Sequence, residues 1–322
     1  MPVAAAAAGA VCISSSAVLM KLASTASPSV TALGRCAFAL PVLGGLSVLE
    51  RRRGAAPMPS RSRWLARLAG VFLAADLIVW SHSIAAIGAG LGTVVGNLEV
   101  LIIALLAWLF LGERPGRSLV LASPVMLAGL ALVGGLADVG VSRAYGTDPA
   151  LGVGLGVGVA ALYAVYILML RQATSPGSAG TAIAAPLFEA TAGATVASVL
   201  LGLALHDLRL GPPWPALGWL ALLALTSQVA GWLLITVSMP RLAAGMIGAL
   251  LLIQPAGSVA LSYVFLGEHP SVLQLAGVAL VLAGVVVAVA GRTPEADYSR
   301  HRTRIIRQAP TASTGRSPSK SP

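Results

Sequence analysis

One long stretch of this chain occurs twice. Residues 91–117, LGTVVGNLEVLIIALLAWLFLGERPGR, match residues 246–272, MIGALLLIQPAGSVALSYVFLGEHPSV, at a constant offset of about 155 residues. Both copies contain an apolar run that leads into Leu-Gly-Glu-x-Pro. The alignment needs no gap far upstream of this motif, where Trp64 falls on Trp219. The chain therefore contains one structural unit in two copies.

The composition of the chain indicates that this unit lies in a membrane. Hydrophobic residues make up 57% of the chain and charged residues 10%, and the mean hydropathy is +0.87. In a soluble domain about a quarter of the residues would be charged. Apolar segments of roughly 20 residues, the length that crosses a bilayer as a helix, recur along the sequence, whereas membrane β-strands would alternate over about ten residues. We therefore expect an all-α integral membrane protein.

Ten apolar segments are long enough to be transmembrane helices. They cover residues 3–22, 30–49, 64–87, 91–111, 118–136, 149–171, 179–205, 214–239, 242–266 and 271–290. These segments predict four domains: a first five-helix repeat (1–137), an outer linker (138–149), a second five-helix repeat (150–291) and a disordered basic cytoplasmic tail (292–322). Because each repeat has an odd number of helices, the second repeat is expected to be inverted in the membrane relative to the first.

The distribution of basic residues predicts the orientation of the chain. Short loops rich in Lys and Arg remain on the cytoplasmic side, and the Glu-Arg-Arg-Arg run at 50–53 opens such a loop. With this loop inside, only Lys21, Arg35, Arg143 and Arg209 of the 21 basic residues fall outward. We expect a multi-pass protein of a bacterial-type inner (plasma) membrane, with both termini cytoplasmic and the tail near anionic lipid. The net charge of +10 then needs no nucleic-acid partner.

The sequence contains no pattern that indicates a cofactor, a metal site or a catalytic group. The Gly-rich opening of the sixth segment, LGVGLGVGV, lacks the preceding strand and the spacing of a dinucleotide fingerprint. It is typical of close helix packing through small residues. No metal-ligand spacing, Walker loop or nucleophile-base constellation occurs, so we expect no cofactor, no metal and no enzyme activity.

Glu99 is the leading candidate for a residue that binds the substrate or a coupling ion. Ionisable groups inside membrane spans are energetically costly and usually mark a substrate or ion pathway. Glu99 lies about two turns inside the fourth segment, where the second copy has the neutral Gln254. Its carboxyl group could bind a cationic solute or take up a proton, since surroundings of low dielectric favour the neutral form. The alternative is an ion pair with Arg35 or a hydrogen bond between helices.

Two segments carry a polar residue one turn before a tryptophan. Asp76 and Trp80 in the third segment, and Gln228 and Trp232 in the eighth, have the i, i+4 spacing that places each pair on one helix face. These pairs could line a cavity for an organic solute, with cation–π contact if the solute is cationic. Packing tryptophans beside a hydrogen-bonded aspartate are the alternative. Tyr163 and Tyr166 in the sixth segment are further candidates for the cavity wall, with packing between helices as the alternative.

Three further acidic residues have candidate structural or gating roles. Glu189 aligns within one residue of Arg35, so that corresponding helices carry opposite charges. This predicts either an ion pair or gate between the two, or two separate polar contacts. Glu113 and Glu268, in the repeated motif, are expected to cap the turns that join helices four to five and nine to ten.

These features resemble the drug/metabolite transporter superfamily, and specifically its EamA type, over about residues 9–291. The likeness rests on ten helices in two halves, each with an apolar helix, Leu-Gly-Glu-x-Pro and then a Gly-containing helix. Lys21 and Arg35 stand where that family often has basic residues, and Gln254-Pro255 stands where it commonly has a polar residue followed by proline. The first copy departs from this pattern, with Glu99-Val100 at the equivalent place.

The resemblance and the inverted repeat together imply a secondary transporter, and more specifically an exporter, of a small organic metabolite or drug-like solute by alternating access. Proton coupling is one alternative within this class. A different class is a membrane sensor or accessory protein with the same fold and no turnover, since fold does not determine function. The expected partners are the solute, membrane lipid and protons as the coupling ion, while a homodimer stays open. The sequence does not identify the solute.

Overall fold

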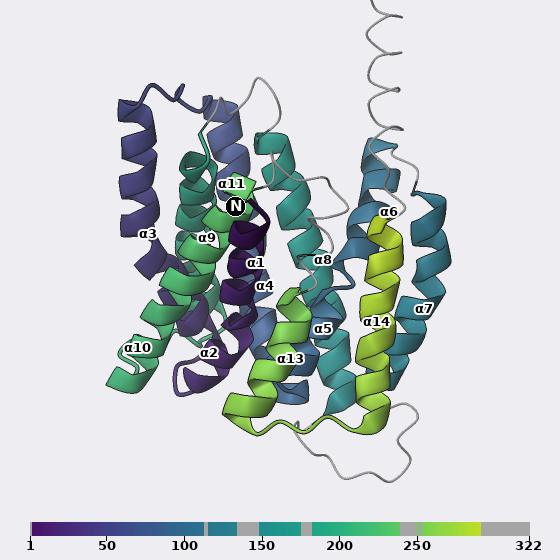
Figure 1. Ribbon diagram of the computed structural model, residues 1–322. Coiled ribbons are helices and arrows are strands. Elements are labelled where there is room, and N and C mark those ends of the chain that lie inside the picture. Colours follow the sequence, from purple (N-terminus) through teal and green to yellow (C-terminus); the bar gives the residue numbers. More distant parts are fainter. Residues whose placement is uncertain are drawn as a thin grey trace, which may run out of the picture.

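The computed structural model describes residues 2–112, 115–133, 148–174, 182–238, 250 and 253–290, and its secondary structure there is entirely helical (Figure 1). Within these residues, seven helices are long and apolar enough to cross a membrane, and three more apolar helices are shorter, namely Arg117–Val133, Ile253–Leu266 and Val272–Ala288. The prediction of an all-α membrane protein is confirmed for this part of the chain. Most of the outer linker, the start of the ninth segment and the tail lie outside the described residues.

The helices follow the predicted apolar segments closely. In chain order they are α1 (Pro2–Ser14), α2 (Ser16–Leu22), α3 (Pro28–Arg52), α4 (Ser60–Ile87), α5 (Ala89–Gly96), α6 (Glu99–Leu111), α7 (Arg117–Val133), α8 (Pro149–Ala173), α9 (Ala184–Ala204), α10 (Trp214–Leu223), the π-helical η1 (Ala224–Gly231), α11 (Trp232–Ser238), α13 (Ile253–Leu266) and α14 (Val272–Ala290). Proline opens α3 and α8, where its fixed φ and missing N–H suit the first helical position.

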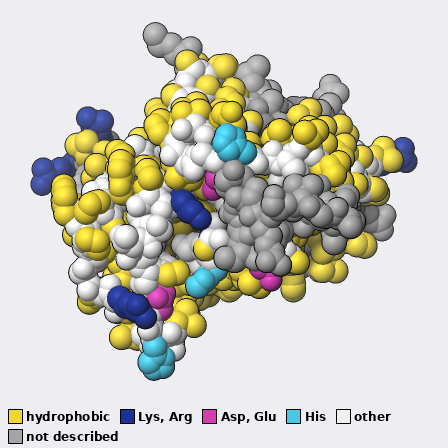
Figure 2. All heavy atoms as spheres, turned by 90° about the horizontal axis from the view of Figure 1, so that it is seen from below, with side chains coloured by type: hydrophobic (Ala, Val, Ile, Leu, Met, Phe, Trp, Pro, Cys, Tyr) yellow, Lys and Arg dark blue, Asp and Glu magenta, His cyan; other side chains and the backbone are white. Residues whose placement is uncertain are grey.

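The outer surface of the bundle is apolar. Large hydrophobic side chains point outward along the helices, among them Phe110 at 79% exposed and Leu121 at 72%. Hydrophobic side chains form most of the rim seen in Figure 2, and charged side chains are few there. Exposed apolar surface on this scale is unusual for a soluble monomer, and it suits contact with lipid.

Within the described residues, three of the segments predicted as single helices are interrupted. The first is interrupted at Ser15, between α1 and α2, and the eighth contains the π-helical η1. The fourth is broken between α5 and α6, where the N–H of Asn97 bonds the carbonyl of Val94 (3.1 Å), three residues back instead of four. Irregular backbone at membrane depth is tolerated where protein or a polar cavity surrounds it, and π-helical turns are frequent at functional sites. These interruptions therefore indicate where a cavity lies.

Equivalent helices of the two repeats pack in antiparallel pairs. At one end of α3, the N–H of Ser29 donates to Asp207 Oδ2 (3.1 Å), just after the end of α9. At the other end, Glu50 Oε2 accepts the N–H of Ala184 (3.0 Å) at the start of α9. Ser29 and Ala184 are equivalent at the repeat offset, so each helix start is capped by a carboxylate near the end of its counterpart. Figure 1 shows α7 beside α14, which form the second such pair.

Glu268 caps the start of a helix in the first repeat. The sequence predicts instead that it caps the turn between the ninth and tenth helices. Its Oε1 accepts the N–H of Ala89 (2.8 Å) and its Oε2 accepts that of Gly90 (3.1 Å), at the start of α5. The carboxylate is 6% exposed, and free N–H groups at a helix N-terminus stabilise a negative charge. Gly88, with φ at 93°, gives the backbone the left-handed turn that aims α5 at it. Glu113 lies outside the described residues.

We expect Glu268→Gln to lower the free energy of unfolding by about 1 kcal/mol, because an amide has one acceptor oxygen for the two N–H groups. Asp148→Asn is the matched control, since Asp148 Oδ1 accepts one N–H, from Leu151 (3.0 Å), at an exposed helix start. Asparagine caps helices about as well as aspartate. Thermal unfolding in detergent compares the two variants, and a melting temperature for Glu268→Gln equal to that of Asp148→Asn contradicts the cap.

Candidate functional site

A cavity of about 90 Å³ lies among helices of both repeats. It has room for several water molecules, or for the polar part of a small organic solute. Nine of the residues that the sequence singled out line its wall: Arg35, Asp76, Trp80, Glu99, Tyr163, Tyr166, Gln228, Trp232 and Gln254. Glu189 is not among the lining residues. The cavity thus brings together polar side chains that are up to about 220 positions apart in the sequence.

Each of the three interrupted segments supplies a polar residue to this wall. Ser16 follows the break between α1 and α2, Asn97 lies at the break between α5 and α6, and Gln228 lies in η1. An interruption leaves backbone polar groups without their usual helical partners, which is costly beside lipid. Placing the interruptions at a polar cavity removes that cost and explains why the chain keeps them.

Arg35 holds the π-helical segment to α3. Its Nε donates to Gln228 Oε1 (3.0 Å) and its Nη2 to Ser227 Oγ (3.3 Å). Ser16 Oγ donates to the same Ser227 Oγ (2.6 Å), and Gln228 Nε2 donates to Thr191 Oγ1 (3.3 Å). The guanidinium is part of a side chain only 5% exposed. Two of its three nitrogens are thus committed to a network that joins helices of both repeats.

The two carboxylates of the cavity have no such network. Asp76 is 4% exposed, and its buried Oδ1 has no hydrogen-bond partner among the described residues. Glu99 is part-buried and accepts no hydrogen bond within that same part of the chain. Neither carboxylate lies within 4.0 Å of a cationic nitrogen of Arg35. The structure therefore lacks the Glu99–Arg35 ion pair that the sequence left open. Both acidic groups therefore face the cavity without a described partner.

Aromatic rings form a second part of the wall. The ring centroids of Tyr163 and Trp232 are 6.5 Å apart, and those of Tyr163 and Tyr166 are 5.5 Å apart. Trp80 contributes a further indole from α4. The cavity can thus offer negative charge, hydrogen bonds and aromatic surface to a ligand, an arrangement suited to binding a solute.

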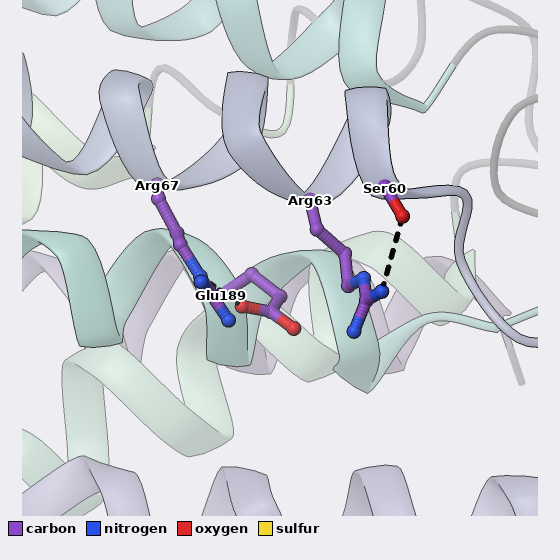
Figure 3. Close-up of polar contacts among 4 residues, drawn as sticks. All are labelled: Ser60, Arg63, Arg67 and Glu189. Carbon is purple, nitrogen blue, oxygen red and sulfur yellow. Dashed lines mark hydrogen bonds and ion pairs between the residues drawn. The ribbon is translucent and has the colours of Figure 1, made fainter.

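Glu189 pairs with Arg67, away from the cavity. Glu189 Oε2 lies 2.7 Å from Arg67 Nε, and Figure 3 shows the two side chains pointing toward each other from α9 and α4. One turn earlier in α4, Arg63 Nη2 donates to Ser60 Oγ (3.3 Å). Of the two arrangements predicted for Arg35 and Glu189, the structure has two separate polar contacts. The sequence did not identify Arg67 as the partner, because the contact joins residues 122 positions apart in the chain.

Sequence reasoning also missed three polar residues of the wall, which are Ser16, Thr93 and Asn97. Residues two positions apart in a continuous helix point about 200° apart, so Asn97 would face away from a cavity that Glu99 faces. The break at 97–98 removes that constraint. A polar residue inside an apolar segment was the available signal for both Ser16 and Asn97.

Comparison with known proteins adds three findings. Residues 1–135 and 150–290 each match the model of a family described as the EamA-like transporter family. No curated protein matches the chain. Among 26 matching solved chains, one described as "Crystal structure of protein" is 18% identical, has a TM-score of 0.57, and is aligned over 90% of this chain and 96% of its own length. At this identity the likeness shows a shared fold alone.

Proposed function

Because the chain belongs to the EamA-like transporter family, we propose that it is a secondary transporter that exports a small organic solute through the central cavity by alternating access. The observation that carries this proposal is the cavity itself, which is walled by both repeats, bordered by three helix interruptions and lined by two carboxylates that have no partner among the described residues. Discontinuous helices at an interface between repeats form the solute sites of many secondary transporters. Membrane lipid and the solute are the proposed partners.

The proposed architecture is ten transmembrane helices in two inverted halves. The antiparallel contact of α3 with its equivalent α9 supports this arrangement, because exchange of conformation between inverted halves closes one side of the membrane and opens the other. We place both termini in the cytoplasm of a cell with an inner (plasma) membrane. Reporter domains inserted at Arg143 and fused to the tail should lie on opposite sides, and detection on the same side contradicts this topology.

Flux into vesicles that contain only this protein tests the proposal. We expect at least one member of a panel of cationic, zwitterionic, anionic and neutral organic solutes to cross in a saturable, protein-dependent manner without ATP. Vesicles without protein are the control. A solute that raises the melting temperature of the protein and never crosses the membrane would instead support the sensor or accessory protein.

Glu99 is the proposed proton-coupling residue, because it has no described partner and its equivalent, Gln254, is neutral. In the same vesicles, a pH gradient should drive solute flux by the wild type. Glu99→Gln cannot exchange a proton, so whatever flux remains should be equal with and without the gradient. Asp148→Asn, which removes an exposed carboxylate outside the cavity, should keep the gradient dependence. Wild-type gradient dependence in Glu99→Gln excludes Glu99 as the coupling site.

A further inference from the structure

The charged side chains of the cavity do not balance. Arg35 contributes one positive charge, whereas Asp76 and Glu99 contribute two negative charges when both are ionised. No other charged side chain occurs among the described residues of the wall. Uncompensated charge is costly in surroundings of low dielectric. The wall therefore favours a ligand that brings one positive charge.

The aromatic part of the wall favours an organic cation over a metal ion. Trp80, Tyr163 and Trp232 present aromatic rings to the same cavity as the two carboxylates. A cation within about 6 Å of an aromatic ring centroid is attracted by the ring, and alkyl groups around the charge pack against the ring face. Hard metal ions prefer shells of oxygen ligands rich in carboxylates, and the described residues contain no group of three or more Asp, Glu, His or Cys side chains that could hold a metal ion.

The state of Arg35 disfavours a ligand that carries its own carboxylate. Arg35 Nε and Nη2 already donate to Gln228 and Ser227, and the buried Nη1 has no hydrogen-bond partner among the described residues. A solute carboxylate could accept one hydrogen bond from Nη1, but a two-point pairing with the guanidinium would break its bond to Gln228 or to Ser227. Without that pairing, its negative charge would face Asp76 and Glu99.

We propose that the solute of this cavity is a compact organic monocation, an amine or quaternary ammonium whose charge lies near Glu99 and Asp76 and whose alkyl groups contact Trp80, Tyr163 and Trp232. This assignment rests on the proposed function, since it takes the cavity as the site of the transported solute. A volume of about 90 Å³ suits a compact ion. Arg35 holds the π-helical part of the wall through Gln228 and Ser227.

Three probes of nearly the same shape test the charge of the solute. Choline is a cation, 3,3-dimethylbutan-1-ol is its neutral isostere, and glycine betaine is a zwitterion with the same trimethylammonium group. In calorimetric titrations of the purified wild type, choline should bind at least about tenfold more tightly than either of the others, the expected effect of one partly desolvated ionic contact.

Variants test whether the acidic residues of the cavity cause this preference. Glu99→Gln should weaken choline binding by about tenfold or more and leave the neutral isostere unchanged, so that the preference between the two disappears. Asp148→Asn should keep it, because that carboxylate is exposed and outside the cavity. If Glu99→Gln does not fold, Asp76→Asn makes the same test, with the same expected loss of preference.

The outcomes separate this inference from the proposed function. Absence of choline binding, equal binding of the three probes, tighter binding of betaine, or an unchanged preference in Glu99→Gln overturns the monocation assignment. Flux of another class of solute would then still support a transporter. Choline binding with the expected preference, but without flux in vesicles, supports the monocation site and contradicts the proposed function.

Discussion

Gly193→Ala should be one of the most damaging single-methyl changes in this protein. A Cβ atom at Gly193 in α9 would lie 2.2 Å from the carbonyl oxygen of Arg67 and 2.8 Å from its Cα, both in the backbone of α4. The facing Gly70 is equally tight, with the carbonyl oxygen of Ala190 at 2.1 Å from the position of a Cβ. Backbone atoms cannot move aside as a side chain can, so the two helices must separate. We expect a loss of about 3 kcal/mol in the free energy of unfolding.

Gly154→Ala in α8 is the matched control for this prediction. A Cβ there meets no atom within 4 Å, and alanine in a helix is more favourable than glycine by about 0.5–1 kcal/mol. The two identical substitutions should therefore shift the melting temperature in opposite directions. Thermal unfolding of the purified variants in one detergent measures both. Equal melting temperatures would show that α4 and α9 do not pack through these glycines.

Arg35→Met should produce the other large loss of stability. The substitution leaves Asp76, which is 4% exposed, without a positive charge in its cavity, and it removes both donors to Gln228 and Ser227. Removing one member of a buried set of opposite charges typically costs about 3–5 kcal/mol. Arg209→Met changes an exposed arginine and should leave the melting temperature almost unchanged.

A second substitution tests the electrostatic cause. Asp76→Asn in the Arg35→Met background removes one of the two negative charges, so the double variant should recover part of the lost melting temperature. The lost hydrogen bonds to Gln228 and Ser227 should prevent full recovery. A double variant that is less stable than Arg35→Met alone would show that Asp76 is not destabilised by the loss of the arginine.

The helices and most of the cavity residues could be predicted from the sequence because the membrane imposes strong local constraints. A span needs a long apolar segment, which located every described helix. An ionisable side chain inside such a segment needs polar surroundings. This requirement selected Arg35, Asp76 and Glu99, which line the cavity, and also Glu189, which pairs with Arg67 instead. The repeat further indicated which helices are equivalent.

The helix interruptions and the partners of several charged groups could not be predicted, because distant contacts determine them. Gly96 precedes the break at Asn97, but glycine is also frequent in the unbroken α8. The π-helical η1 is held by Ser227, which bonds Arg35 and Ser16 from other helices. Glu268 likewise reaches the start of α5 from 179 positions away in the chain. No local pattern encodes such pairings.

If one cavity opens to the two sides of the membrane in turn, a single thiol in its wall should react from both sides. Asn97→Cys places the thiol on the cavity wall, in a chain whose Cys12 and Cys36 have been replaced by alanine. Val196→Cys, at an exposed apolar position in the middle of α9, is the control and should not react. In oriented vesicles, a membrane-impermeant maleimide should label the Asn97→Cys variant when added to either side. Labelling from one side only, with and without solute, would contradict alternating access.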